Sequence, residues 1–477
     1  MMYMPFLLSG LGILLSLSFD VFKMSYFQIL LSIGIFVSGI YIFLQDGYLT
    51  YMYGIFFTDP INCLMLLTVS FLELFVSLYS FGYIRTETAQ GVPKRRFRYY
   101  YFWKNAFILS MFVSILSNNL GVYWVGLEAT TLATAFLIAF YRSKESYEAS
   151  WKYVMMCSIG ITLGLFAVVL LYYATAKLYG ESLSSLSFVN IISVANSLDK
   201  KLLFLSFILA LVGFGTKAGF APMHNWLPDA HSQAPSPISA LLSGVLLNTA
   251  LLGVIRFYQI NQKAGIVYAG KFLLFFGTLT LFLASLLMLK QSEYKRLFAY
   301  SSMENMGVIS LGLSMGGLAT FGALIHILFH ALSKGVLFMA AGNILSVLHK
   351  RKINEVKALF KGMKRSAFIL TFGLAGISGF PPFSTFLSKM YTIVGTVQKS
   401  PLLGMVMLLS ISLAFAGLFY QMLPMLFGEE SKEKEKNLHP LMLLVPATML
   451  ITLLVFTFYL PQDFLKRVWD AVHEIEY

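Results

Sequence analysis

Leu202-Leu-Phe-Leu-Ser-Phe-Ile-Leu-Ala-Leu-Val-Gly-Phe-Gly-Thr-Lys-Ala-Gly-Phe-Ala-Pro222 is the stretch where a long apolar run meets a lysine, a glycine and a proline. A hydrocarbon core of ~30 Å takes about 20 helical residues to cross, so Lys217 is expected inside a membrane span. Gly219 and Pro222 free backbone groups from the helix ladder, which hydrocarbon tolerates only beside protein or water. The stretch therefore predicts a broken membrane helix with a buried amine at the break.

The rest of the 477-residue chain is equally apolar, with 58% hydrophobic and only 12% charged residues. This composition exceeds what one soluble core can bury, and it makes the lipid bilayer the main solvent. Apolar runs long enough to span a membrane start near positions 4, 25, 57, 102, 121, 152, 201, 238, 272, 297, 320, 367, 401 and 440. We expect an all-α polytopic membrane protein with about fourteen transmembrane helices in a single domain, residues 1–477.

Lysine and arginine sort to one side of this arrangement. Alternate loops hold 23 of the 35 basic residues, the opposite segments hold eight, and the spans hold Lys217, Arg256, Lys334 and Lys389. The basic loops are residues 19–24, 81–104, 141–152, 289–296, 348–366 and 428–439. They are expected on the cytoplasmic side of the cell membrane, with both termini outside. Because topology accounts for most of the net charge of +13, nucleic acid is not expected as a partner.

A second broken span contains Gly376-Ile-Ser-Gly-Phe-Pro-Pro382 ahead of Lys389. Interrupted helices in two halves of a chain are typical of inverted-repeat transporters, whose ion sites lie at the breaks. Glu128 precedes Lys217 by 89 residues, and Glu304 precedes Lys389 by 85, which fits a duplication. We expect two inverted five-helix repeats, near residues 102–258 and 269–427.

Glu128 and Lys217 are candidates for proton exchange, because a charge inside the membrane is costly unless it is paired or titrates. Changing the distance between a buried amine and a carboxylate loads or unloads a proton. The alternatives are a structural ion pair for Glu128 and a snorkelling or helix-capping role for Lys217.

His326, His330 and Lys334 recur at i, i+4 and i+8, which is one stripe of a single helix. Imidazole changes charge near neutral pH, so two histidines one turn apart on a buried stripe suit a proton relay. The alternative for each histidine is a hydrogen bond between helices. No third ligand lies nearby in sequence, so no metal site is expected. Lys389 is expected at the far end of the row.

The segment Met223–Pro235 is the most polar stretch attached to any span. Its His224, Asp229 and His231 are expected to line a path for water from the cytoplasm, and the alternative is a capped re-entrant turn. Glu304 is placed inside a span, close enough to its boundary to reach the interface. Arg256, near the end of its span, is expected to be an interfacial anchor.

Residues 220 to 237, Phe-Ala-Pro-Met-His-Asn-Trp-Leu-Pro-Asp-Ala-His-Ser-Gln-Ala-Pro-Ser-Pro, resemble the proton-transporting subunits of complex I and the related multisubunit Na+/H+ antiporters. Further motifs in the family's order are Trp124–Glu128, Lys295–Ser302, His326–Gly342 and Gly379–Pro382. Four short segments look most like the membrane subunit of hydrogenase-4 and other group 4 membrane-bound hydrogenases: Leu127–Thr131, Tyr141–Ser143, Ala149–Tyr153 and Gly244–Asn248.

The resemblance implies a fourteen-helix subunit that contains no cofactor and is not itself the catalyst. Cys63 and Cys157 likewise lack the spacing of a metal or iron–sulfur site. The implied partners are other membrane subunits of the same family and a soluble redox arm that is hydrogenase-like and carries iron–sulfur centres.

By the same resemblance, Glu128 pairs with Lys217, His330 and His326 bridge the centre, and Lys389 faces the exit. One position departs from the family. The family commonly has a lysine where this chain has Asn248, which cannot titrate. Either water and His330 cover this gap, or the subunit conducts incompletely.

We therefore expect an H+-translocating membrane subunit of an energy-converting redox complex, most similar to a group 4 membrane-bound hydrogenase. One alternative is a subunit of a multisubunit Na+/H+ antiporter, driven by an ion gradient. The other is a non-conducting structural subunit, which Asn248 favours.

Overall fold

The computed structural model describes residues 3–45, 49–427 and 438–476, and most of them are helical. The long helices are α1 (Met4–Ser18), α2 (Val21–Leu44), α3 (Pro60–Ala89), α4 (Lys94–Ile115), α5 (Leu120–Ile138), α6 (Lys144–Tyr179), α8 (Lys200–Ala218), α11 (Leu247–Lys263), α12 (Val267–Met288), α13 (Tyr294–Met315), α14 (Leu318–Leu348), α16 (Lys364–Ser378), α17 (Ser384–Lys399), α18 (Pro401–Phe427), α19 (Pro440–Phe458) and α20 (Gln462–Glu476). The shorter elements are β1 (Leu49–Tyr51), β2 (Phe56–Thr58), η1 (Ala139–Tyr141), η2 (Leu183–Leu186), α7 (Phe188–Val194), η3 (Ala195–Ser197), α9 (Trp226–Gln233), α10 (Ser236–Leu241), η4 (Leu242–Leu246), η5 (Ile353–Glu355) and α15 (Leu359–Gly362). The two strands pair as an antiparallel hairpin.

The predicted all-α membrane fold is confirmed, because every predicted span coincides with a helix or a pair of helices. Within the described residues, ten helices are long and apolar enough to cross a membrane. The count of fourteen is not confirmed. Helix α1 is short, α4 and α13 carry ionisable residues along their length, and α16 and α17 are short helices on either side of a break.

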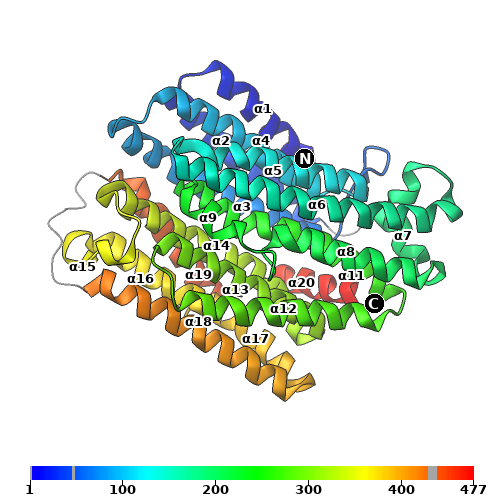
Figure 1. The fold of residues 1–477 in the computed structure, drawn as a ribbon. Coiled ribbons are helices and arrows are strands. Elements are labelled where there is room, and N and C mark those ends of the chain that lie inside the picture. Colours follow the sequence, from blue (N-terminus) through cyan, green and yellow to red (C-terminus); the bar gives the residue numbers. More distant parts are fainter. Residues whose placement is uncertain (1–2, 46–48, 428–437, 477) are drawn as a thin grey trace.

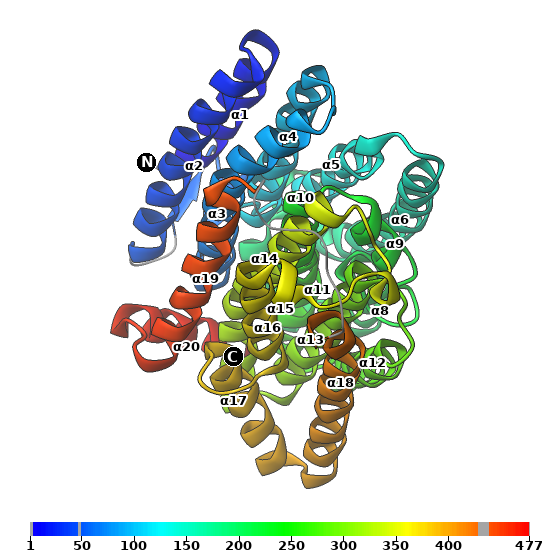
Figure 2. The ribbon, with the colours of Figure 1, turned by 90° about the vertical axis from the view of Figure 1, so that its left-hand side faces the viewer.

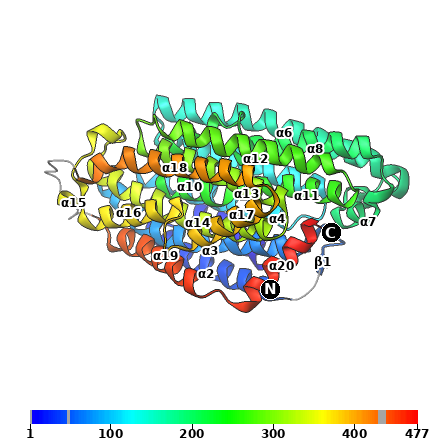
Figure 3. The ribbon, with the colours of Figure 1, turned by 90° about the horizontal axis from the view of Figure 1, so that it is seen from below.

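The long helices run side by side in one bundle, and the first and last described residues lie at the same end of it (Figures 1 and 3). We call the opposite end the basic end. It holds α15 and the junctions between α3 and α4, η1 and α6, α12 and α13, and α14 and α16, where the predicted basic loops lie. Of the predicted basic loop 428–439, residues 428–437 lie outside the described residues.

Helices α11 and α14 form the centre of the bundle and are buried on nearly all sides. Figure 2 looks along the bundle and places α14 between the flank of α1, α2 and α4 and the flank of α17 and α18. Gly322 of α14 faces Thr392 of α17 so closely that a Cβ atom would meet its backbone. Small residues of this kind let membrane helices pack tightly.

Two helices are broken, at the positions that the sequence predicts. Helix α8 ends at Gly219 with φ +84°, and α16 ends at Gly379 with φ +78°, a left-handed conformation that favours glycine. Trp226 Nε1 donates to the backbone oxygen of Thr216, near the end of α8, at 2.9 Å. Lys389 Nζ likewise donates to the backbone oxygen of Ile377, near the end of α16. Helix α8 runs toward the basic end and α16 runs away from it (Figure 1), the antiparallel relation expected of inverted repeats. The repeat boundaries stay predictions.

Candidate functional site

The first break brings Lys217 against α5. Lys217 is fully buried, and its Nζ donates to Thr131 Oγ1 and to the backbone oxygen of Leu127, each at 2.5 Å. Thr131 donates in turn to Glu128 Oε2 at 3.2 Å, and Ser158 of α6 donates to Glu128 Oε1 at 3.0 Å. Glu128 itself is partly exposed. One hydroxyl therefore links the expected partners, in place of a direct ion pair.

The second break brings Lys389 against α13. Lys389 Nζ lies 3.1 Å from Glu304 Oε1 and 3.5 Å from Oε2, and both side chains are buried. Glu304 is buried inside the bundle. The sequence had left open whether its side chain reaches the membrane interface. Glu304 and Lys389, which lie 85 residues apart in the sequence, thus form a direct ion pair that uses both carboxylate oxygens.

Helix α14 carries the central histidines. Both ring nitrogens of His326 are engaged, with Ser388 Oγ and Asn305 Oδ1 each at 2.8 Å. The ring centre of His330 lies 6.1 Å from that of His326, and its Nε2 lies 3.3 Å from the backbone oxygen of Ser243 in η4. His330 Nδ1 has no partner among the described residues. His326 has the geometry of a hydrogen bond between helices, whereas His330 keeps one nitrogen available.

One turn further along α14, Lys334 Nζ donates to Ser301 Oγ at 2.8 Å and to the backbone oxygen of Phe298 at 2.9 Å. Asn248 follows the π-turn η4, and its Nδ2 donates to Gly244 O at 2.7 Å within its own helix. π-turns inside helices are frequent at functional sites. The centre of the bundle is therefore polar, and at position 248 it holds an amide, which cannot titrate.

Several buried polar atoms near this row have no protein partner in the described part of the chain: His330 Nδ1, Asn248 Oδ1, Ser236 Oγ, Ser333 Oγ, Ser378 Oγ and Ser384 Oγ. Buried polar atoms in proteins are hydrogen-bonded, to water where no protein group serves. They belong to α10, α11, α14, α16 and α17, and two of these helices, α14 and α17, carry His330 and Lys389. The arrangement favours hydration between His330 and the second break.

Residues 117–416, which hold both breaks and all the contacts above, match the family described as "NADH:quinone oxidoreductase/Mrp antiporter, TM". The chain belongs to this family. It is 36% identical over 377 residues to the hydrogenase-4 component F homolog of Methylacidiphilum infernorum, covering 78% of this chain and 79% of that protein. It is 34% identical over 348 residues to hydrogenase-4 component B of Escherichia coli, covering 70% of this chain and 50% of that longer protein.

Two solved structures share the fold of this family member. A chain of the archaeal membrane-bound sulfane sulfur reductase superposes with a TM-score of 0.87 at 23% identity, covering 100% of this chain and 96% of the other. A chain of the Mrp complex from Dietzia sp. superposes with a TM-score of 0.81 at 17% identity, covering 99% and 96%. The family predicted from the motifs is confirmed, and the likeness extends beyond the matched segment to the whole chain.

Asp229 lies in α9, which follows the first break at the basic end. Its carboxylate lies 2.7 Å from Arg296 and 3.4 Å from Lys152, in a partly exposed ion-pair cluster. His224 is buried beside the ring of Tyr300 at 6.1 Å, and its Nδ1 has no partner in the described ranges. The structure therefore places Asp229 and His224 at the basic end of the bundle, in separate contacts. Their role toward water stays a prediction.

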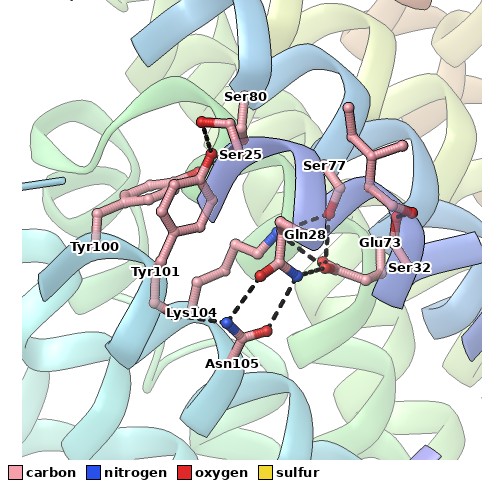
Figure 4. Close-up of polar contacts among 11 residues, drawn as sticks. Ser25, Gln28, Ser32, Glu73, Ser77, Ser80, Tyr100, Tyr101, Lys104 and Asn105 are labelled. Atoms are coloured by element: carbon pink, nitrogen blue, oxygen red, sulfur yellow. Dashed lines mark hydrogen bonds and ion pairs between the residues drawn. The ribbon is translucent and has the colours of Figure 1, made fainter. Parts of the chain in front are cut away.

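Sequence reasoning missed a buried pair that lies before the segment that matches the family. Lys104 was assigned to the basic loop 81–104, but α4 begins at Lys94, so Lys104 lies well inside the helix. Its Nζ lies 2.8 Å from Glu73 Oε1, and both side chains are fully buried (Figure 4). The available signal was Glu73, an acid within a span for which the sequence offered no cation.

Two further basic residues are corrected by the structure. Lys295, assigned to the loop 289–296, is buried, and its Nζ donates to Ala234 O at 2.6 Å. Arg256, expected to anchor the interface, is buried and paired with Asp59 at 2.6 Å, with the ring of Phe188 4.4 Å from its guanidinium. Both side chains are drawn into the protein because helix packing there supplies an acceptor or a counter-ion.

Proposed function

We propose that this family member is the proton-translocating membrane subunit of an energy-converting redox complex of the hydrogenase-4 type. The observation that carries the proposal is a row of ionisable residues that starts at Lys217 and the partly exposed Glu128, passes the buried His330 and Lys334, and ends at the buried Lys389. Ionisable residues inside a membrane typically mark ion pathways. The relatives named as hydrogenase-4 components support the type of complex.

The geometry supplies a mechanism for proton transfer. Lys217 donates to Thr131, which donates to Glu128, so a small displacement of α8 exchanges the bridge for a direct ion pair or leaves the amine free to release its proton. A proton released by Lys217 moves through water to His330 Nδ1. The pair of Lys389 and Glu304 takes up a proton when it opens and releases one when the ion pair reforms.

The sidedness follows from the distribution of charge. We propose that the basic end faces the cytoplasm of the cell membrane, with both termini outside. Protons enter beside Asp229 and His224 and leave beyond Lys389. The proposed partners are homologous membrane subunits and a soluble redox arm with iron–sulfur centres, because the relatives are named as components of larger complexes.

The test uses the intact complex in everted membrane vesicles. Lys217→Met and Lys389→Met are expected to lower redox-driven proton uptake at least about tenfold, the effect of about 1.4 kcal/mol on a transfer barrier. Lys271→Met is the matched control, since Lys271 lies at the first turn of α12 against Tyr268, outside the row. Unchanged pumping by both row variants, in complexes that assemble fully, contradicts the proposal.

The second candidate is a subunit of a multisubunit Na+/H+ antiporter, and the shared fold with a chain of the Mrp complex favours it. The two functions differ in their energy source. Proton movement driven by added Na+ in the absence of an electron donor supports the antiporter, and movement that needs the donor supports the redox complex. A non-conducting subunit, which Asn248 favours, predicts that none of the row variants changes ion movement.

A further inference from the structure

Glu73 and Lys104 are the centre of a polar cluster between α2, α3 and α4 (Figure 4). Glu73 Oε1 accepts from Lys104 Nζ at 2.8 Å, from Ser77 Oγ at 2.9 Å and from Gln28 Nε2 at 3.3 Å. Lys104 Nζ also donates to Ser77 Oγ at 2.8 Å. Asn105 and Gln28 exchange two hydrogen bonds, of 2.9 and 3.0 Å, which fix the amide that faces the carboxylate.

Among the described residues, the carboxylate of Glu73 accepts hydrogen bonds through one of its two oxygens. Three donors converge on Oε1, while the buried Oε2 has no partner among the described residues. A buried ion pair stabilises a fold only when further hydrogen bonds satisfy its remaining atoms, and an apolar replacement is often as stable. An acid held in lipid surroundings with one open oxygen is therefore better suited to binding a proton than to holding helices together.

Helix α3 provides a path from the basic end to this carboxylate. Five polar residues follow one face of the helix, and we call them the α3 stripe: Glu73, Ser77, Ser80, Tyr83 and Glu87. Their spacing of three or four residues puts consecutive members about 4.5–6 Å apart along the helix. All five are buried.

Side chains from neighbouring helices complete the α3 stripe. Ser80 Oγ and Tyr100 Oη share a hydrogen bond of 2.9 Å, and Tyr83 Oη is hydrogen-bonded to Tyr141 Oη. Tyr141 Oη donates to Glu87 Oε2 at 3.4 Å. Hydroxyls both donate and accept, so a row of them can pass a proton between two carboxylates.

We propose that Glu73 and Lys104 form a second proton-exchange site, filled from the basic end along the α3 stripe and separate from the row of the two repeats. One proton adds to Glu73 Oε2, which neutralises the carboxylate, opens the ion pair and raises the net charge of the cluster from zero to +1. Loss of that proton restores the carboxylate and the pair. Protonation itself is independent of the proposed function, and only its use in translocation rests on that function.

Helix α3 also connects this site to the centre of the bundle. Leu72, next to Glu73, packs against Gly335, the residue after Lys334, and against Gly244 of η4. Tyr79 Oη donates to Met339 O and to Asn343 Oδ1 of α14, each at 2.9 Å. A shift of α3 on protonation therefore reaches the turn of α14 that carries Lys334.

Few titratable or charged groups face Glu73. Helix α4 presents Lys104, Tyr100 and Tyr101, α2 presents Gln28, and α14 reaches α3 with glycines and apolar side chains around Lys334. Helices α1 and α19 contain no titratable side chain. Tyr101 donates its hydroxyl to Ser25 of α2, away from the carboxylate. The acid–base exchange therefore lies between Glu73 and Lys104.

The direct test is infrared difference spectroscopy of the purified complex between high and low pH. The wild-type complex is expected to gain a protonated-carboxyl band at low pH that Glu73→Gln lacks and Glu73→Asp shifts. A complex in which all three proteins give the same bands overturns the proposal. If Glu73→Gln fails to assemble, the comparison of Glu73→Asp with wild type decides alone.

The path is tested with two matched tyrosine variants on or beside α3. Tyr100→Phe removes the α4 hydroxyl that is hydrogen-bonded to Ser80 of the α3 stripe, and it is expected to slow proton exchange at the Glu73 carboxyl about tenfold in time-resolved spectra. Tyr79→Phe removes an equally buried hydroxyl that faces α14 and is expected to leave that rate unchanged. Equal rates in both variants overturn the path. Normal exchange at Glu73 alongside normal pumping by Lys217→Met would contradict the proposed function and leave this site standing.

Discussion

The two halves of the molecule contain the same acid–base pair in two arrangements. In the second half, Lys389 contacts both oxygens of Glu304, and both side chains are buried. In the first half, Thr131 lies between Lys217 and Glu128, and Glu128 is partly exposed. The second pair is a direct contact between buried side chains, whereas the first is bridged by a hydroxyl.

This difference indicates how one half can differ in proton occupancy from the other. A direct ion pair in a medium of low dielectric constant holds its proton tightly. A hydroxyl bridge satisfies both groups without bringing the charges together, so direct contact of the amine and the carboxylate stays available as a second arrangement. We therefore interpret the bridged pair of the first half as the state before proton uptake. We interpret the direct ion pair of the second half as the state after it.

The largest expected effect concerns the stability of the direct pair. Lys389→Met leaves Glu304 buried without its cation, and breaking a buried pair in this way costs about 3–5 kcal/mol. Lys217→Met leaves Glu128 with Ser158, Thr131 and partial exposure, so its cost is expected to be clearly smaller. Thermal unfolding of the detergent-solubilised complex measures both.

The matching control is the double variant Glu304→Gln with Lys389→Met, which removes both charges. It is expected to recover most of the stability that Lys389→Met loses. Equal melting temperatures for Lys217→Met and Lys389→Met would remove the distinction between a bridged and a direct pair.

The next effect concerns the bridge. Thr131→Val keeps the shape of the side chain but removes the hydroxyl, which leaves Lys217 without one acceptor and Glu128 without one donor. The loss of a buried hydrogen bond is about 1–3 kcal/mol, so pumping is expected to fall about tenfold. Thr130→Val is the control, since Thr130 donates only to Leu127 O in its own helix. If Thr131→Val pumps at the rate of Thr130→Val, the bridge has no part in transfer.

The sequence predicted the breaks and the fold because each leaves a local pattern. Proline and glycine after an apolar run locate Gly219 and Gly379, and the spacing of acids and lysines relates Glu304 to Lys389. Lys104 was missed because a cluster of basic residues between two spans resembles a cytoplasmic loop, and only the helix start at Lys94 places it in the interior.

The contacts that distinguish the two halves were also beyond sequence reasoning. Whether a hydroxyl lies between an amine and a carboxylate depends on how the helices are rotated against each other, which hydropathy does not encode. The same holds for His326 and His330. They share one stripe of α14, but only the packing of α13 and α17 decides that His326 is fully bonded.

The third prediction separates these two histidines, which lie between the halves. His330→Gln removes the ring with the open nitrogen and is expected to abolish most pumping while the complex stays folded. His326→Gln disturbs bonds to Ser388 and Asn305 and is expected mainly to lower the melting temperature, by the equivalent of about 1–3 kcal/mol. Vesicle pumping and thermal unfolding are measured on the same preparations. A reversed pattern would assign the relay to His326.

The smallest effect is expected at the basic end of the first half, where Asp229 forms ion pairs with Lys152 and Arg296. These side chains are partly exposed, and exposed ion pairs contribute about 0–1 kcal/mol, so Asp229→Asn is expected to change the melting temperature little. Its carboxylate instead attracts protons to this end of the protein, and salt at physiological concentration screens that attraction within about 8–10 Å. The variant is therefore expected to slow pumping modestly at low ionic strength and not at high ionic strength. A rate loss that persists in high salt would mean that Asp229 binds the transported proton directly, which would extend the proposed proton path of the first half to the protein surface.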